Sequence, residues 1–129
     1  MPGPDHTNTI IVGGGAAGLA CAVCLARRGI PYIVLEKNVA GGQSWSQRYE
    51  RLHLHTPRNS SSLPLLPMPR YYPKYVSKDD VARYLELYAT TFDVTPRFNQ
   101  KVMRAERKDN VWKVSTDKQT FSSDHLIIA

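Results

Sequence analysis

Two short apolar runs near the N-terminus are separated by a glycine-rich turn and an alanine-rich segment. The runs occupy residues 9–12 and 32–35, and each is bounded by turn-forming residues, as is typical of buried strands. Residues 16–28 contain good helix formers and no proline, and Gly29 follows them as a helix stop. The pattern predicts a strand, a helix and a second strand parallel to the first.

Prolines interrupt the middle of the chain, and a second helical pattern follows them. Five prolines between residues 57 and 73 exclude a regular helix there and confine any strand to short edge pieces. The same segment is rich in leucine and tyrosine, so we expect it to pack on the rest of the protein. Beyond it, Ser77 and Asp80 resemble a capping box, and apolar residues then recur at helical spacing as far as Ala89.

The last third of the chain has the pattern of strands. Residues 101–107 and 111–116 are strand-like and are joined by a predicted hairpin turn at Asp109-Asn110. A third strand is expected to begin at Phe121, and residues 124–129 form a buried strand that runs to the C-terminus. We therefore predict an α/β fold, a Rossmann-like parallel sheet with an inserted antiparallel β-meander. Because its most hydrophobic strand comes last, we expect the sequence to be truncated at the C-terminus.

The positive charge of the chain is concentrated in its proline-rich middle. Between residues 37 and 74, six lysines and arginines stand against Glu50 alone, which accounts for most of the formal net charge of +6. These cations fall in a proline-rich loop that we expect next to the site predicted at the glycine-rich turn, so we expect a mouth that favours phosphates or an anionic small-molecule substrate, rather than a merely solvated loop. Nucleic acid is disfavoured as a partner, because the cations neither follow one helix nor alternate with exposed aromatics.

The sequence lacks the marks of several other classes of protein. It has no run of about eighteen apolar residues, so no membrane-spanning segment is expected. The first apolar run is too short for a secretory signal, and a cytoplasmic location is therefore expected. No residues cluster at metal-ligand spacing, so no metal site is predicted.

The glycine-rich turn has the pattern G-x-G-x-x-G and directly follows the first predicted strand. In such a turn the first glycine permits the sharp bend, the second lets a pyrophosphate approach the backbone, and the third lets the helix pack on the sheet. The helix N-terminus then favours the negative charge of the phosphates. An ordinary turn without a ligand is the weaker alternative. The residues of the motif are Gly13, Gly14, Gly15, Ala16, Ala17 and Gly18.

Glu36 ends the second predicted strand at the offset that a nucleotide site requires. A carboxylate at this position accepts hydrogen bonds from ribose hydroxyls, and it would repel a 2′-phosphate. The first nucleotide site therefore suits FAD or NAD better than NADP.

Cys21 and Cys24 form a Cys-x-x-Cys pair that allows two interpretations. Such a pair is the redox centre of flavin disulfide reductases. These two cysteines lie in the middle of the predicted helix, however, whereas a reactive dithiol usually lies at a helix N-terminus, where the dipole lowers the thiol pKa. We therefore favour burial of both cysteines against the sheet.

Taken together, these features resemble the flavin-containing monooxygenases, in particular their YUCCA-type branch, over nearly the whole chain. The resemblance rests on the glycine motif, Glu36 and several further stretches. These are Gly41-Gly42 with Trp45, residues 48–57, Leu63-Pro64 and residues 92–99.

The resemblance implies an oxidoreductase that uses FAD, NADPH and O₂ to oxygenate a small substrate. For the YUCCA-type branch this substrate is a 2-oxo acid such as indole-3-pyruvate, in auxin biosynthesis. Residues 1–129 would be the FAD/NAD(P)-binding domain. The sequence contains no second G-x-G-x-x-G, so the NADPH-binding domain would be absent. The alternatives are a non-catalytic FAD-binding fragment and, less favoured, a flavin disulfide reductase.

The resemblance also implies roles for individual residues. Residues 13–18 would cradle the FAD pyrophosphate, and Glu36 with its neighbour Lys37 would hold the adenosine. Ser44 and Trp45 would line the flavin, while His55 and Thr56 would contact the isoalloxazine and nicotinamide, His55 being the catalytic candidate. The simpler alternatives are that His55 caps a turn and that Trp45 anchors a loop. Two departures bear on these roles. Animal-type members carry asparagine at position 55, and the glycine pair is one residue farther than usual from Trp45.

Overall fold

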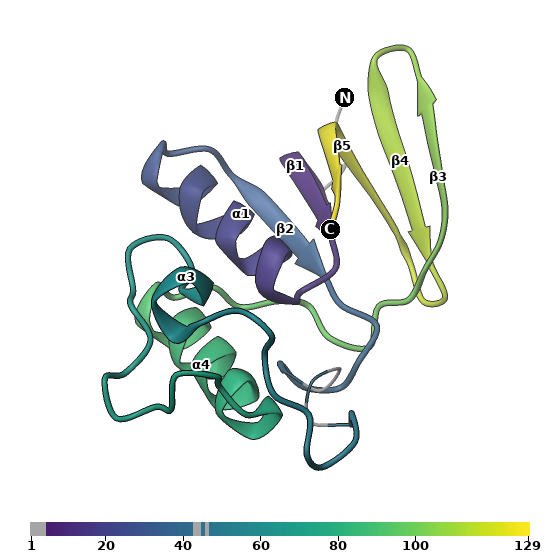
Figure 1. Ribbon diagram of the computed structural model, residues 1–129. Coiled ribbons are helices and arrows are strands. Elements are labelled where there is room, and N and C mark those ends of the chain that lie inside the picture. The colour runs from purple at the N-terminus through teal and green to yellow at the C-terminus, as the bar shows by residue number, and fades with distance from the viewer. Residues whose placement is uncertain (1–4, 43–44, 46) are drawn as a thin grey trace.

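The computed structural model describes residues 5–42, 45 and 47–129, which form one mixed sheet with helices beside it (Figure 1). The sheet has five strands in the order β2-β1-β5-β4-β3. Its strands are β1 (His6–Val12), β2 (Tyr32–Leu35), β3 (Val102–Lys108), β4 (Val111–Thr116) and β5 (Thr120–Ile128). The helices are α1 (Ala16–Arg27), α3 (Arg58–Ser61) and α4 (Lys78–Thr91).

The β2-β1-β5 part of the sheet is parallel, as the sequence predicts. β1 pairs in parallel with β2 on one side and with β5 on the other. α1 connects β1 to β2 and lies against both strands. Since the chain leaves β1 toward β2 and later returns to the opposite side of β1, the order of parallel strands reverses at this strand. Ligands of open α/β sheets bind at the carboxyl ends of the strands beside such a reversal.

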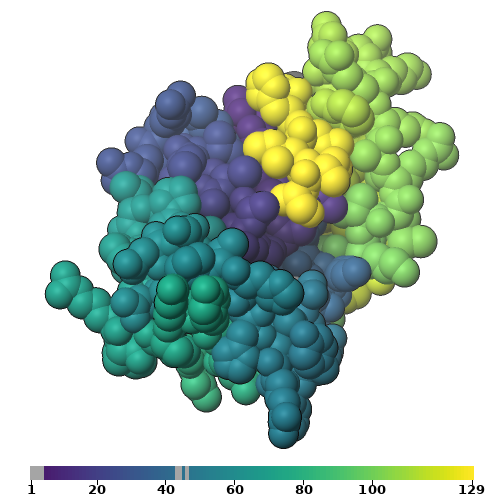
Figure 2. All heavy atoms as spheres, in the orientation of Figure 1, coloured from purple at the N-terminus to yellow at the C-terminus, as the bar shows by residue number. Residues whose placement is uncertain are grey.

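The antiparallel meander is an extension of the same sheet. β3 pairs with β4, and β4 pairs with the first part of β5. The sequence suggested one strand from Phe121 and another over residues 124–129, and this division is wrong, because β5 is continuous over nine residues. The polar residues near its middle do not break it. Ser123 is fully buried because it is paired with Thr7 on one side and with Trp112 on the other. Figure 2 shows β5 at the surface between β1 and the β3–β4 hairpin.

The sheet has an apolar core on each face. The helical face contains Leu19 and Val23 of α1 with Tyr84 and Tyr88 of α4, and all four are buried. The opposite face contains a smaller core. Its fully buried members are Ile10, Leu35, Val114 and Phe121. The β-meander thus contributes half of the second core, which explains why the parallel strands are apolar on both sides.

The proline-rich segment packs on α4, as expected from its apolar content. Met68, Tyr72 and Val76 are buried against the helical core. The exclusion of helix from this segment is wrong in one place, where α3 makes a single turn directly after Pro57. Proline is compatible with that position because the first N–H groups of a helix lack partners in any case.

The N-terminus of α4 has the predicted cap. The Ser77 hydroxyl accepts a hydrogen bond from the Asp80 N–H at 3.2 Å. The Asp80 carboxylate pairs with Arg83, whose Nη1 lies 3.2 Å away. The serine therefore acts as the cap, and the acid adds a surface ion pair along the helix.

We expect the stability of the fold to fall at alkaline pH. Burial raises the pKa of Tyr88 to about 12 and also raises the pKa of Tyr84 above its ordinary value of 10.0. The folded state keeps these phenol protons where the unfolded chain loses them. Stability is therefore complete below about pH 10 and declines as the pH rises toward 12, by up to about 1.4 kcal/mol per pH unit for each such tyrosine.

Urea unfolding measured between pH 8 and 11.5 checks this expectation. Tyr88→Phe should flatten the alkaline decline, although it also removes the hydrogen bond from the phenol to the Pro64 carbonyl oxygen. Tyr71→Phe is the matched control, because Tyr71 is 84% exposed. An equal alkaline slope in wild type and Tyr88→Phe would contradict the assignment.

Candidate functional site

The glycine turn is a compact bend between β1 and the first turn of α1. Gly13 has φ +107°, a conformation that other residues rarely adopt. Gly18 lies so close to the bend that a Cβ atom there would stand 1.8 Å from the Gly13 carbonyl oxygen. The first and third glycines of the motif are therefore required by the backbone itself.

Gly15 has a different environment from the other two. Its φ of −82° is open to any residue, and a Cβ added to it would have no protein atom within 4 Å. Gly15 is the N-cap of α1, so the unpartnered N–H groups of the first helical turn begin here. Open space beside such N–H groups and the positive end of a helix dipole suits an anionic group such as a pyrophosphate.

Glu36 is buried beside this turn, with 9% of its surface exposed. Its Oε1 atom accepts a hydrogen bond from the Gly14 N–H at 2.9 Å, and its Oε2 atom accepts one from the Asn38 N–H at 2.7 Å. The carboxylate therefore joins the glycine turn to the end of β2. A carboxylate can accept about four hydrogen bonds, so capacity for ribose hydroxyls is left.

We expect Glu36→Gln to lower the free energy of unfolding by about 1–3 kcal/mol. The amide has a single acceptor oxygen, so either the Gly14 or the Asn38 N–H would face an NH₂ group. Thermal and urea unfolding of the ligand-free protein measure the effect. Glu86→Gln is the control, since Glu86 is exposed on α4. Unchanged stability of Glu36→Gln would show that the two hydrogen bonds do not hold the turn.

A cleft of ≈ 460 Å³ opens at the carboxyl ends of β1 and β2. The glycine turn forms one wall and the start of β3 forms another. Glu36 and Lys37 lie between them, and Gln100 and Lys101 face them from the segment before β3. The structure thus brings Gly13, Gly15, Glu36 and Lys37 to one cleft, whereas Gly14 lines the second cavity and Ala16, Ala17 and Gly18 line neither. The sequence reasoning missed Gln100 and Lys101, because nothing in their local pattern marks them.

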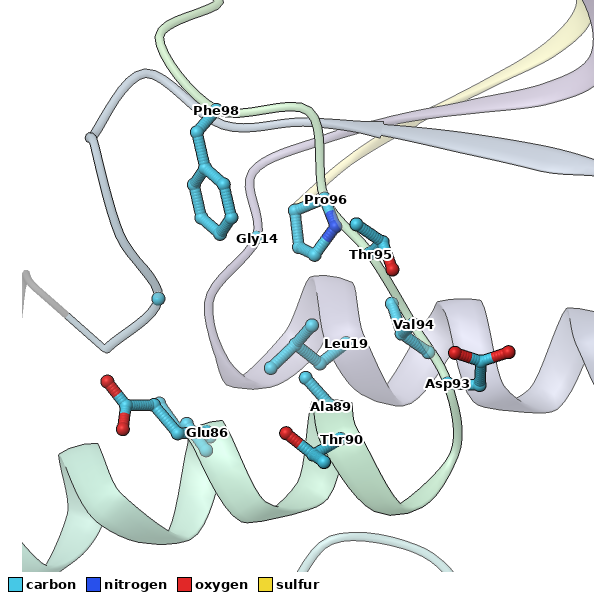
Figure 3. A pocket seen from close by; sticks show the side chains of 12 residues that line it. Gly14, Leu19, Glu86, Ala89, Thr90, Asp93, Val94, Thr95, Pro96 and Phe98 are labelled. Atoms are coloured by element: carbon cyan, nitrogen blue, oxygen red, sulfur yellow. The ribbon is translucent and has the colours of Figure 1, made fainter.

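A second cavity of ≈ 420 Å³ lies on the helical side of the glycine turn (Figure 3). Leu19 of α1 occupies the centre of its wall, with Pro96 and Phe98 on the facing segment. Glu86 and Asp93 bring two carboxylates to it. An anionic ligand would be repelled here, so this cavity does not match the anionic substrate expected from the sequence.

Of the residues expected on the flavin side, the described ones, Trp45, His55 and Thr56, do not line either cavity. Trp45 packs against the helical core and lies under the Arg48 guanidinium, 4.8 Å from the ring centroid. His55 is exposed, as is Thr56, whose hydroxyl is 2.6 Å from that of Ser61. Ser44 lies outside the described residues. The flavin contacts of these four residues remain predictions.

The cations in the basic middle of the chain have different roles in the structure. The Arg58 guanidinium donates hydrogen bonds to the carbonyl oxygens of Arg70 and Tyr72, and so fastens the proline-rich segment. Arg51, Arg70 and Lys74 are exposed. Of the six cations in residues 37–74, Lys37 is the one that lines the cleft at the carboxyl ends of β1 and β2.

The two cysteines are free, and they differ in exposure. Cys21 is half-buried, and Cys24 is exposed. The predicted burial of both is therefore wrong for Cys24. The buried face of α1 runs through Leu19, Ala22 and Val23, and Cys24 lies next to this face.

Searches of the described residues for a metal centre and a membrane span gave no candidate. No three His, Cys, Asp or Glu side chains among the described residues are placed to hold a metal ion. No helix in the same part of the chain is long and apolar enough to cross a bilayer.

Comparison with known proteins gave a family and several relatives. The model of the family described as pyridine nucleotide-disulphide oxidoreductase matches residues 10–129. A probable indole-3-pyruvate monooxygenase of Arabidopsis thaliana, YUCCA4, is 42% identical over the whole chain, which spans 31% of that relative. The indole-3-pyruvate monooxygenase YUCCA1 of Oryza sativa subsp. japonica is 45% identical, and the match covers 84% of this chain and 27% of the relative.

A solved structure agrees with these matches. A flavin-containing monooxygenase from Stenotrophomonas maltophilia superposes with a TM-score of 0.86 at 26% identity, over 97% of this chain and 38% of that one. The expected resemblance to flavin-containing monooxygenases and the α/β fold class are thereby confirmed. The chain spans about 30% of the length of the curated relatives it matches.

Proposed function

The chain belongs to the pyridine nucleotide-disulphide oxidoreductase family, and from this premise we propose that it is the FAD-binding part of an NADPH-dependent flavin monooxygenase. The observation that carries the proposal is the cleft in which open space at Gly15 adjoins the Glu36 carboxylate. The names of the relatives support the monooxygenase activity of the whole protein.

The residues of the cleft fit the ADP half of FAD. The α1 N-terminus and the open side of Gly15 would take the pyrophosphate, and Glu36 would accept hydrogen bonds from the ribose hydroxyls. Lys37 adds positive charge at the same cleft. The bound flavin would supply the redox and oxygen chemistry, with electrons from NADPH. The chain's own part is to bind and orient this cofactor.

We propose a small 2-oxo acid such as indole-3-pyruvate as the substrate, which would place the whole protein in auxin biosynthesis. The relatives' names support this choice, and the exposed arginines of the basic segment suit an anion. Trp45 with Ser44 would line the flavin, and His55 with Thr56 would contact the isoalloxazine and nicotinamide. The sequence holds no second glycine motif, so NADPH would bind mainly to other parts of the longer protein.

Titration of the purified chain with FAD tests the proposal, with FMN as the control ligand. FMN lacks the AMP half, which the cleft would hold, so FAD should bind much more tightly. Equal affinities, or no binding of FAD, would contradict the proposal. NADPH oxidation with and without indole-3-pyruvate then distinguishes a catalytic chain from a non-catalytic FAD-binding one. We favour a non-catalytic, FAD-binding chain, because this chain spans 31% of the relative YUCCA4.

The disulfide reductase alternative depends on the cysteine pair. It requires that the protein reduce a disulfide substrate in an FAD-dependent reaction, and that Cys21→Ser abolish this activity. In the folded, oxidised protein a redox-active pair would form a disulfide and would not react with a maleimide. Labelling of both thiols under these conditions would therefore argue against a disulfide reductase. Cys24, being exposed, should label readily in the free state.

A further inference from the structure

We propose that Gln100 reads the base of the bound nucleotide, by donating a hydrogen bond from its amide Nε2 to an acceptor nitrogen of the adenine ring. This inference rests on the proposed function, because it assumes that the cleft holds the ADP half of FAD. It goes further in naming a side chain that selects the base.

The order of groups along the cleft places the base near Gln100. The phosphates belong at Gly15 and the ribose at Glu36, so the base continues away from the helix N-terminus, toward the start of β3. The backbone holds Gln100 beside the ribose position, because its N–H donates to the Glu36 carbonyl oxygen at 2.9 Å. The neighbouring Asn99 N–H donates to the Asn38 carbonyl oxygen at 3.0 Å. Gln100 itself lines the same cleft.

The hydrogen bonds of Thr116 determine which end of the Gln100 amide is available. The Thr116 hydroxyl oxygen accepts from the N–H groups of Lys118 and Gln119, both at 3.1 Å. These two bonds use its two lone pairs, so its proton must be donated. Two acceptors are within reach of that proton, the Gln100 Oε1 atom at 2.8 Å and the Gln119 carbonyl oxygen at 3.2 Å, and the shorter distance favours Gln100. The amide oxygen is thereby occupied, and Nε2 is the polar group that Gln100 can offer to a ligand.

The segment that carries Gln100 is tied to the turn after β4. The Asp117 N–H donates to the Lys101 carbonyl oxygen at 3.0 Å, and the Lys101 N–H donates to the Asp117 carboxylate at 3.2 Å. The Gln100 side chain is therefore held by the Thr116 hydroxyl, and the backbone that carries it is held by the bonds to Glu36 and Asp117. A donor fixed before the ligand arrives loses little conformational entropy on binding, which favours selectivity.

The charged side chains of the cleft cannot read a base in this way. Glu36 is an acceptor whose oxygens already hold two backbone N–H groups. Lys37 and Lys101 carry mobile ammonium groups that suit phosphates better than one ring nitrogen. Two neutral amides line the cleft, Asn38 and Gln100. Gln100 is the directed donor of the two, because the Thr116 hydroxyl holds its amide oxygen.

A thermodynamic cycle between Gln100 and single ring nitrogens tests the inference. ADP and its 1-deaza, 3-deaza and 7-deaza analogues are titrated into the full chain and into Gln100→Ala. In the wild type, the loss of one ring nitrogen should weaken binding about threefold to tenfold, the value of one neutral hydrogen bond. In Gln100→Ala, ADP should bind about that much more weakly, and the same analogue should bind as well as ADP.

The control variants separate base reading from damage to the fold. Gln119→Ala removes a glutamine side chain from the neighbouring exposed turn and should leave the affinity series unchanged. Thr116→Val should lose the discrimination, and Thr116→Ser, which keeps the hydroxyl, should restore it. If ADP binds, but each analogue's affinity relative to ADP is the same in Gln100→Ala as in the wild type, the inference is overturned while the nucleotide site stands. If neither ADP nor FAD binds, the proposed function fails with it.

Discussion

Replacing Gly15 with alanine is expected to weaken FAD binding strongly while the fold remains intact. The backbone at Gly15 has φ −82°, which alanine adopts without strain, and the added methyl group would meet no protein atom within 4 Å. In the proposed complex that space belongs to the pyrophosphate. Overpacking of this kind costs about 1–3 kcal/mol, which corresponds to roughly a tenfold to hundredfold loss of affinity.

FAD titration and thermal unfolding of the ligand-free protein measure the two halves of this expectation. Gly41→Ala is the matched control, because a methyl group there also meets nothing within 4 Å, but it lies beside the second cavity. The control should bind FAD within about twofold of wild type. Wild-type affinity in Gly15→Ala would mean that the phosphates do not approach the turn, and a large loss of stability would mean that the space is not open.

The parts of the fold and site that could be predicted from the sequence are local. The strand–turn–helix around residues 13–18 is predictable because Gly13 and Gly18 each answer a constraint among close neighbours, the positive φ of Gly13 and the close approach of Gly18 to the Gly13 carbonyl oxygen. The cap at Ser77 was predictable for the same reason. Glu36 was found by its offset from the motif, and the structure places its carboxylate on the Gly14 N–H.

The remaining features depend on residues far apart in the chain. Ser123 looks like a break in a strand until its two neighbouring strands are known, because pairing on both sides satisfies its backbone. Cys24 was assigned to a buried face from composition, whereas the partner helix α4 decides which side of α1 is covered. Gln100 is held at the cleft by two contacts distant in sequence, from its N–H to the Glu36 carbonyl oxygen and from the Thr116 hydroxyl to its amide oxygen. No pattern in residues 97–102 encodes these contacts.

Gly18→Ala should have the opposite consequence to Gly15→Ala and should destabilise the fold itself. A Cβ atom at Gly18 would lie 1.8 Å from the Gly13 carbonyl oxygen and 2.9 Å from its carbon. Both are backbone atoms, so α1 would have to move away from the end of β1. Alanine is the better helix former by about 1 kcal/mol, but this gain is outweighed by overpacking of about 3 kcal/mol or more.

This loss is a large part of the free energy of unfolding, which is about 5–15 kcal/mol for a domain. The melting temperature should therefore fall on the order of 10 °C. Thermal unfolding without ligand measures it, with Gly15→Ala as the control from the same motif. Because Gly18 acts through packing and Gly15 through the ligand, FAD at a concentration that saturates the wild type should raise the melting temperature of Gly18→Ala but add little to that of Gly15→Ala. If Gly18→Ala and Gly15→Ala were equally stable without ligand, Gly18 would not be required for the close packing of α1 on the turn.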